Sequence, residues 1–440
     1  MPSVLGALPT GRMMDLADAL IRARGRYVDA HPDSQVLAER ARAVMPGGNT
    51  RSVLHVDPFA FRVGDVDGRY LLDIDGHRYL DLLGDYSCGL LGHHPQPVAD
   101  AVRKRLDAGW SLGAMSDAEI AFAEAVVARF ASIEQVRFTN SGTEANLMAI
   151  MTARHATGRD RVVVFDGGYH GGLLYFGPSG AALRAPFDYA VLDYNDVAAL
   201  ERELDAHGDQ IACVLVEPML GAGGCIPATP EFLDALRRGT TDAGCLLIFD
   251  EVMTSRMAPG GAQEATGVVP DMTTLGKYLA GGFSFGAFGG AATVMGAYDP
   301  ASGELAHGGT FNNNAFTMTA GSAVNDLVVA EGVLDAVNAR GAALQEQLTA
   351  VFAASPLEFC VTGWGSLCTI HPVAEPVSCA ADLRATDDRW RRLLFFDLLE
   401  AGFYIAQRGY IGLSVEITDD DVARFVAAVA AFCDRNSNTS

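Results

Sequence analysis

The sequence predicts an α/β protein in which a large domain, built on a mostly parallel sheet, stands beside a smaller α+β domain made from both chain ends. The middle of the 440-residue chain alternates short apolar runs with helical patterns, which is typical of a parallel sheet covered by helices. The flanks instead combine amphipathic helices with turn-rich strands. We therefore expect the small domain to begin at 1–83, the large domain to span 84–325, and the small domain to finish at 326–440.

Four apolar runs predict the strands of the large domain. Each is short, β-branched or aromatic, and followed by polar or glycine residues. The runs are 135–138, 162–165, 213–216 and 246–249. Helices fit between them, because Ser116 and Glu119 predict a capping box that opens a helix to about Phe130. Thr229 predicts an N-cap with Pro230 in the first helical position.

The flanks predict the smaller domain. Residues 10–45 have the pattern of amphipathic helices, and 52–83 have the turn-rich pattern of a strand meander. From about 330 the chain is helical and then mixed. It ends in a helix whose start is capped by residues 418–421.

The composition restricts the possible partners. A hydrophobic fraction of 49% supplies a sizeable core, and a net charge of −22 disfavours nucleic acid and anionic membranes. The uncharged stretch 278–298 is about long enough to span a membrane but is rich in glycine, so we expect a loop and a buried strand. No secretion signal is evident at the N-terminus, and we expect a cytoplasmic protein.

The cysteines favour the same compartment. None of them forms a CxxC pair, which favours reduced, buried thiols over disulfides or a zinc site. We expect no metal centre. The cysteines are at positions 88, 213, 225, 245, 360, 368, 379 and 433.

Lysine is almost absent from this chain, whose positive charge comes from arginine. Of the 32 Lys and Arg residues only Lys104 and Lys277 are lysines. Lys104 lies in the basic stretch 103–105 and fits a surface charge, whereas Lys277 is followed by uncharged, glycine-rich sequence. Arginine cannot replace lysine as an amine that loses its proton and attacks a carbonyl. Lys277 is therefore a candidate nucleophile.

Polar segments follow the predicted strands, where ligands bind in open parallel sheets. Small residues in 139–146 precede a helix, and the hydroxyls of Ser141 and Thr143 add donors. Such a helix start suits one phosphate group, although many ordinary N-caps look similar. The segment 167–172 flanks Tyr169 with glycines, which fits a ring laid on a flat ligand and equally a turn with a packed tyrosine.

Two carboxylates close predicted strands. Glu217 follows the run 213–216, and Asp250 follows the very apolar run 246–249. A buried carboxylate is costly unless it is paired, and a protonated pyridine nitrogen is a suitable partner for Asp250. A helix or turn cap is the alternative role. Phosphate site, flat ring, pyridinium partner and amine then follow one another along the chain.

With these motifs the sequence resembles class III, fold-type I aminotransferases, which use pyridoxal 5'-phosphate. The resemblance covers nearly the whole chain, from Met45-Pro46-Gly47-Gly48 to the last helix, and rests on four motifs: 140–145, 168–171, 250–252 and 275–277. It implies a fold-type I transferase in which Lys277 binds the cofactor covalently and moves the proton, while Asp250 pairs with its ring nitrogen. It implies cofactor contacts from Ser141, Gly142, Thr143, Tyr169, His170, Glu217, Val252 and, from a second subunit, Thr310.

Two branches of that family are similar: glutamate semialdehyde aminomutases and aromatic β-amino acid (β-phenylalanine) aminotransferases. The segment 49–54 resembles the one that brings an arginine, here Arg51, to the substrate carboxylate in the second branch. The Ser-Phe pair within 283–290 and the segment 310–314 also depart from the aminomutase pattern, and both departures favour the second branch. Arg408 is a candidate for a second carboxylate or a surface arginine, because an acidic partner is missing at 221–223. Tyr86 lines the pocket or only packs.

The resemblance implies ping-pong transamination from a β-amino acid to a 2-oxo acid such as 2-oxoglutarate or pyruvate, in a homodimer. Aminomutase activity, another ω-amino acid or amine transamination, decarboxylation and a non-catalytic binding protein are the alternatives. An intact Lys277 and Asp250 argue against the last of these.

Overall fold

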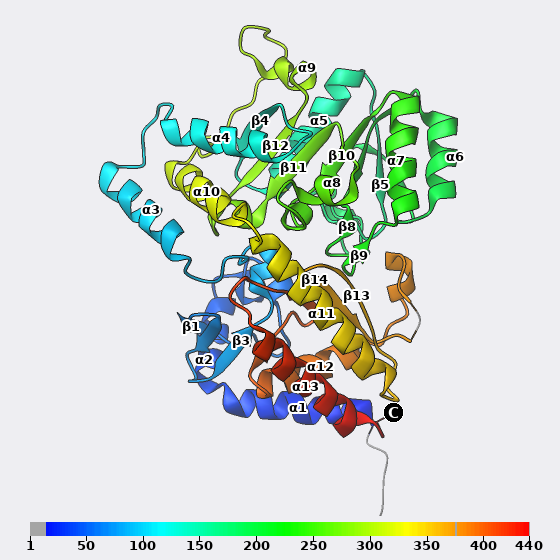
Figure 1. The fold of residues 1–440 in the computed structure, drawn as a ribbon. Coiled ribbons are helices and arrows are strands. Elements are labelled where there is room, and N and C mark those ends of the chain that lie inside the picture. The colour runs from blue at the N-terminus through cyan, green and yellow to red at the C-terminus, as the bar shows by residue number, and fades with distance from the viewer. Residues whose placement is uncertain (1–14, 375, 440) are drawn as a thin grey trace, which may run out of the picture.

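A seven-stranded sheet forms the centre of the larger region of the molecule (Figure 1). The structure is a computed structural model that describes residues 15–374 and 376–439. β12 runs antiparallel to β11 and β4, whereas the other neighbouring pairs are parallel. In sheet order the strands are β4 (Gln135–Thr139), β12 (Gly286–Gly290), β11 (Met272–Gly276), β10 (Leu246–Asp250), β7 (Ile211–Val216), β5 (Arg161–Phe165) and β6 (Asp188–Leu192). The mostly parallel α/β sheet is therefore confirmed.

The central strands are buried on both faces, as their continuous apolar runs predict. All six residues of β7 are buried. Val214 and Val216 face a cluster that includes Phe232 of α7 (Pro230–Ala243), with α6 (Val197–His207) packed against α7. Cys213 and Leu215 face the other way, toward α5 (Gly142–Thr157). Apolar strands between two helical layers have no wet face, so their sequence shows no polar alternation.

Helix starts agree with the sequence in position and differ in one detail. Thr229 caps α7 through its side chain, and Thr418 and Asp421 form a capping box that opens α13. α4 begins at Asp117 as expected, but the capping box at Ser116 is wrong, since the Ser116 side chain makes no cap bond. Glu119 instead accepts a hydrogen bond from Asn313 at 3.0 Å.

Both chain ends build the smaller region, shown in blue and in yellow to red in Figure 1. β15 (Phe403–Tyr404) pairs in parallel with β3 (Arg78–Asp81), which continues the meander of β2 (Tyr70–Asp73) and β1 (Val63–Asp67). A second sheet has the order β13 (Cys360–Trp364), β14 (Leu367–His371) and β16 (Tyr410–Gly412). The boundaries 1–83, 84–325 and 326–440 remain a prediction, and residues 10–14 of the expected helical flank lie outside the described chain.

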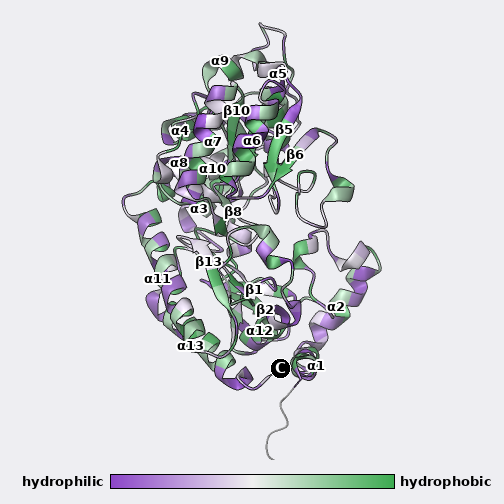
Figure 2. Cartoon of the chain, turned by 90° about the vertical axis from the view of Figure 1, so that its right-hand side faces the viewer, coloured by the Kyte–Doolittle hydropathy of each residue, from purple (hydrophilic) through white to green (hydrophobic). Residues whose placement is uncertain are grey.

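The remaining elements cover these sheets. Figure 2 shows green, hydrophobic strands such as β5 and β10 between helices of mixed colour. The helices around the large sheet are α3 (Gln96–Ala108), α4 (Asp117–Arg129), α8 (Gly261–Thr266), α9 (Ala292–Met295) and α10 (Ala315–Val328). Those of the smaller region are α1 (Leu16–Ala30), α2 (Pro32–Arg42), α11 (Val333–Ala353), α12 (Asp388–Glu400) and α13 (Asp419–Asn436). The short strands β8 (Met219–Leu220) and β9 (Ile226–Pro227) form a separate pair.

The stretch 278–298 contains the fully buried strand β12, as expected. Across the described ranges, no helix has both the length and the apolar character that crossing a bilayer requires. All eight cysteines are free, but three of them, Cys88, Cys360 and Cys379, are only partly buried.

Gly286 allows β12 to approach the start of α5. A Cβ at Gly286 would fall well inside van der Waals contact with the Ser141 carbonyl oxygen. We expect Gly286→Ala to lower the free energy of unfolding by about 1–3 kcal/mol through overpacking, and to weaken cofactor retention, because the shift reaches Ser141. Thermal melting and cofactor absorbance after desalting measure the two effects.

Gly296→Ala is the matched control for that change. Gly296 has φ −60°, and an added Cβ would meet nothing within 4 Å. Equal melting temperatures for the two variants would contradict the close-approach argument.

Candidate active site

Five chemistry-bearing segments meet at one edge of the large sheet. β4, β5, β7, β10 and β11 run in the same direction, so their carboxyl ends lie together. These ends are followed by the start of α5, the loop 167–172, Glu217, Asp250 and Lys277. The fold thus brings together the segments that the sequence placed after successive strands.

Asp250 is a buried charge of this edge, with 4% exposure. Its Oδ2 accepts hydrogen bonds from Asn146 Nδ2 at 2.9 Å and from His170 Nδ1 at 2.8 Å. Its Oδ1 accepts from the Val252 backbone N–H at 3.0 Å. Three donors satisfy the carboxylate, and they also fix its orientation.

Glu217 and His170 lie around Asp250. Glu217 accepts from the backbone N–H groups of Tyr169 at 2.9 Å and Gly221 at 3.0 Å. Burial raises the pKa of the Glu217 carboxyl above its ordinary value, His170 opposes that shift, and the charge of Asp250 adds to it. Glu217 therefore orients the loop that carries Tyr169 and His170.

The start of α5 has the features of an anion site. Ser141 is the N-cap, and its Oγ accepts from Glu144 N–H at 3.2 Å, so its own hydroxyl proton is free to donate elsewhere. Thr143 Oγ1 accepts from Gly172 N–H at 3.2 Å. A Cβ at Gly171 would collide with Thr143. The loop and the helix start therefore approach as closely as a shared phosphate cradle requires.

Val252 is held between two glycines. A Cβ on Gly142 would lie 3.1 Å from Val252 Cγ2, and one on Gly276 would lie 3.2 Å from Val252 Cγ1. Tyr169 from the neighbouring loop is 45% exposed, so one ring face is available. The expected position of a flat ring between Val252 and Tyr169 remains a prediction.

Lys277 follows β11 and has φ +54°, an unusual conformation for a non-glycine residue. Burial lowers the pKa of its amine, the charges of Cys88, Glu217 and Asp250 oppose that shift, and the charge of Arg408 adds to it. A lowered pKa increases the neutral, nucleophilic fraction. Lys104, by contrast, is exposed on α3.

Two arginines flank Tyr86. The guanidinium carbon of Arg51 lies 5.8 Å from the centre of the Tyr86 ring, and that of Arg408 lies 5.3 Å from it. Arg51 pairs with Asp85 at 2.7 Å, and Arg408 donates to the Ala222 carbonyl at 3.4 Å. Because Arg408 lies within this group, its packing differs from that of a simple surface arginine.

The backbone around Tyr86 is strained. Asp85, Tyr86 and Ser87 have φ of 44°, 54° and 75°, so three consecutive non-glycine residues are left-handed. Tyr86 is anchored by a 3.0 Å hydrogen bond to the Val53 carbonyl and stacks on Tyr410, with ring centres 5.6 Å apart. Strain of this kind is retained where the surrounding structure imposes it, often at binding sites.

Thr310 lies in an exposed turn of the single chain. The same segment contacts the start of α5, because Asn140 Nδ2 donates to Asn312 Oδ1 at 2.9 Å. A phosphate contact from Thr310 of a second subunit remains a prediction.

Asn146 is a site residue whose role the sequence did not reveal. It is buried and donates to both Asp250 and the His170 carbonyl, while its Oδ1 accepts from Thr274 at 2.7 Å. The sequence feature that could have indicated this role is a polar residue one turn inside α5, on the helix face that packs on the sheet. Cys88 and Tyr410 were likewise not predicted, because their elements come from other parts of the chain.

Comparison with known proteins identifies the class. The family model of class III aminotransferases matches residues 54–427. The chain belongs to this family, and it is a pyridoxal-phosphate-dependent aminotransferase of fold-type I. A transaminase structure with the cofactor bound is 30% identical, with a TM-score of 0.84, over 92% of this chain and 98% of that one.

Two relatives are similar over most of their length. The β-phenylalanine transaminase of Variovorax paradoxus is 48% identical over 414 residues, 94% of this chain and 95% of the relative. A solved structure of β-phenylalanine aminotransferase from that organism has a TM-score of 0.93, over 95% of this chain and 97% of the other. A glutamate-1-semialdehyde 2,1-aminomutase of Rhodopirellula baltica is 39% identical over 394 residues, 86% of this chain and 90% of the relative.

The residues present fit pyridoxal phosphate. The start of α5 suits a phosphate, the oriented Asp250 carboxylate suits a protonated ring nitrogen, and Lys277 supplies an amine at the same sheet edge. When bound, the cofactor supplies an aldehyde that bonds amines and a ring that accepts electrons.

Replacing Asp250 tests its charge at nearly constant size. Hydrogen bonds to charged groups contribute about 1.5–3 kcal/mol, so Asp250→Asn should lower kcat/KM roughly 10- to 100-fold. Asp188→Asn removes an exposed carboxylate on β6 of the same sheet and should retain activity. Steady-state kinetics measure both variants. If kcat/KM of Asp250→Asn equals that of the wild type, the assignment of Asp250 to the site is wrong.

Glu251 gives a pH prediction. It accepts from Gln263 Nε2 at 2.9 Å and from two backbone N–H groups, and burial raises its pKa from 4.5 to about 7. With a raised folded-state pKa, the stabilisation from the protonated form is complete below pH 4.5 and is lost as pH rises through 7. The stability of Glu251→Gln relative to wild type should therefore rise across this window, by at most about 1.4 kcal/mol per pH unit.

Denaturant unfolding at several pH values measures that difference. The exposed Glu346→Gln on α11 should follow the wild type at every pH. A constant difference between Glu251→Gln and wild type from pH 4.5 to 7 would contradict the assignment.

Proposed function

We propose that this enzyme transfers the amino group of an aromatic β-amino acid, of the β-phenylalanine type, to a 2-oxo acid such as 2-oxoglutarate or pyruvate. The placement of the Arg51 and Arg408 guanidinium groups near the Tyr86 ring, with Arg408 close enough to affect the charge of Lys277, supports the proposal most directly. Two guanidinium groups offer two carboxylate sites, and Tyr86 offers an aromatic surface. The similarity to the Variovorax paradoxus transaminase favours the same substrate class.

Each residue has a defined part in this proposal. Lys277 is the amine that attaches the cofactor and, once free, the base that moves a proton at the amino-bearing carbon. Asp250 keeps the ring nitrogen charged, with Asn146 and His170 holding its orientation. Tyr169 and Val252 cover the two faces of the ring, Glu217 holds the loop that carries Tyr169 and His170, and Ser141, Gly142 and Thr143 hold the phosphate.

Arg51 forks onto the substrate carboxylate in place of Asp85, its present partner at 2.7 Å. Both groups are half exposed, so the exchange of one carboxylate for another costs little. Arg408 takes the second carboxylate of a dicarboxylic substrate, and both guanidinium groups lie near the Tyr86 ring. One pocket thereby serves a donor with an aromatic side chain and an acceptor with two carboxylates.

We further infer a cytoplasmic homodimer with Thr310 reaching the phosphate of the other subunit. The exposed position of Thr310, together with a neighbouring Phe311 that is 67% exposed, supports a second chain over this segment.

Aminomutase activity is the second candidate, favoured by the similarity to the Rhodopirellula baltica protein. An aminomutase needs no separate acceptor, so the two reactions differ in whether product forms without an added 2-oxo acid. The enzyme is incubated with either enantiomer of β-phenylalanine, with and without 2-oxoglutarate or pyruvate. We expect glutamate or alanine to form only with the acceptor present.

Variants connect this reaction to the site. Lys277→Ala should lose turnover, whereas Lys104→Ala, the other lysine, should keep it. Arg51→Lys should raise KM for every carboxylate substrate because the bidentate fork is lost. Arg408→Lys should raise KM for 2-oxoglutarate more than for pyruvate, which lacks the second carboxylate. Absence of amino transfer to any 2-oxo acid would overturn the proposed function.

A further inference from the structure

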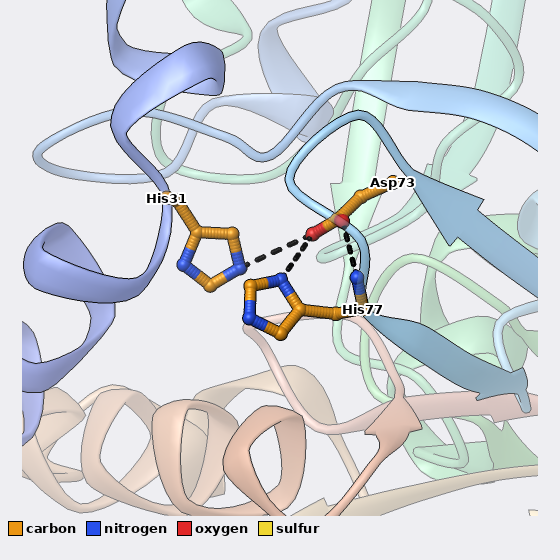
Figure 3. Close-up of side chains that lie close together, drawn as sticks. All are labelled: His31, Asp73 and His77. Atoms are coloured by element: carbon orange, nitrogen blue, oxygen red, sulfur yellow. Dashed lines mark hydrogen bonds and ion pairs between the residues drawn. The ribbon is translucent and has the colours of Figure 1, made fainter.

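Three side chains with metal-ligand chemistry meet in the smaller region (Figure 3). His31 lies between α1 and α2, Asp73 ends β2, and His77 precedes β3. One ligand atom of each lies within 4.8 Å of the others. This cluster belongs to a different part of the fold from the strand ends that carry Lys277 and Asp250.

Hydrogen bonds with neighbouring backbone groups orient the side chains of His31 and Asp73. His31 Nδ1 donates to the Tyr27 carbonyl at 2.6 Å, and since a carbonyl only accepts, the lone pair of the neutral ring is on Nε2. Nε2 lies 2.7 Å from the Tyr79 hydroxyl and 3.3 Å from Asp73 Oδ2. The Asp73 Oδ1 atom is held by the backbone N–H groups of Asp75 at 3.0 Å and His77 at 2.7 Å. Its Oδ2 therefore points at both histidines. A backbone carbonyl on the outer nitrogen of a histidine is the usual support of a metal ligand.

Two of the three distances between ligand atoms are close to those of a tetrahedral site. His31 Nε2 lies 3.3 Å and His77 Nδ1 lies 2.9 Å from Asp73 Oδ2. A zinc ion with bonds of about 2.0–2.1 Å keeps tetrahedral ligand atoms about 3.3–3.4 Å apart. The first distance matches, and the second needs to open by only a few tenths of an ångström.

A bound cation would also stabilise the buried negative charge of Asp73. Its side chain has 0% exposure, and within residues 15–374 and 376–439 its ion-pair partners are these two histidines alone. A neutral imidazole does not compensate a buried carboxylate as a permanent cation does. The side chain of His77 is 37% exposed, which opens a route from solvent.

We propose that His31 Nε2, Asp73 Oδ2 and His77 Nδ1 bind one divalent transition-metal ion, with Zn²⁺ the best match for two imidazoles and a carboxylate. The Tyr79 hydroxyl lies 2.7 Å from His31 Nε2 and 3.1 Å from Asp73 Oδ2, beside the fourth coordination position of the tetrahedron. The ion ties the α1–α2 junction to the β2–β3 turn, which Asp75 already joins through the Asp33 backbone N–H at 2.7 Å. Its role is structural.

Metal binding to the chelator-treated holoenzyme tests this site. Zn²⁺ is titrated by calorimetry, and Co²⁺ is added separately as a visible-absorbance probe of a nitrogen and oxygen ligand set. We expect one ion per chain in the wild type, a higher melting temperature with Zn²⁺, and at least about tenfold weaker binding in His77→Gln. His77 is partly exposed, so this variant retains the core, and His31→Gln is the second variant.

His155→Gln is the matched control. It removes a surface histidine that also faces a carboxylate, Glu304, at 3.0 Å. This variant should bind Zn²⁺ as the wild type does. The proposal is overturned if the wild type takes up no ion, or if His77→Gln binds Zn²⁺ as tightly as the wild type. The cluster is then a hydrogen-bond network alone.

Discussion

The buried carboxylate of Asp250 is the constraint on which the site depends. An ionised carboxylate this far from water persists only if donors surround it, and Asn146, His170 and the Val252 backbone N–H supply them. Those three partners come from α5, the loop after β5 and the turn after β10. Satisfying one charge therefore fixes the relative position of three segments, and the proposed phosphate cradle and ring faces are built from the same three.

The two regions of the fold contribute different chemistry. The large sheet supplies the cofactor groups from rigid strand ends, where small positional errors are costly. The segment 84–87 and Arg408 come from the other elements and surround the proposed substrate site. Stacking of Tyr86 on Tyr410 holds the strained turn 84–87 in place. This division allows related enzymes to share a cofactor and differ in substrates.

Much of the fold was predictable because local rules and tertiary packing agree. Apolar runs buried on both faces became β4, β5, β7 and β10, and Thr229 and Thr418 begin their helices as expected. The capping box at Ser116 failed because Glu119 finds a partner nearly two hundred positions away, in Asn313. Residues that act through distant neighbours were missed for the same reason. The role of Asn146 depends on its contact with Asp250, and that of His31 on its proximity to Asp73 and His77. No local sequence pattern predicts contacts between residues so far apart in the chain.

The scarcity of lysine has a practical consequence for handling the protein. Lys104 is exposed on α3, whereas Lys277 is only partly exposed at the sheet edge. Reagents that couple to primary amines thus encounter one fully accessible lysine side chain, apart from the chain's own α-amino group. Attachment of an activated resin or a dye to a side chain would therefore occur mainly at Lys104 on α3.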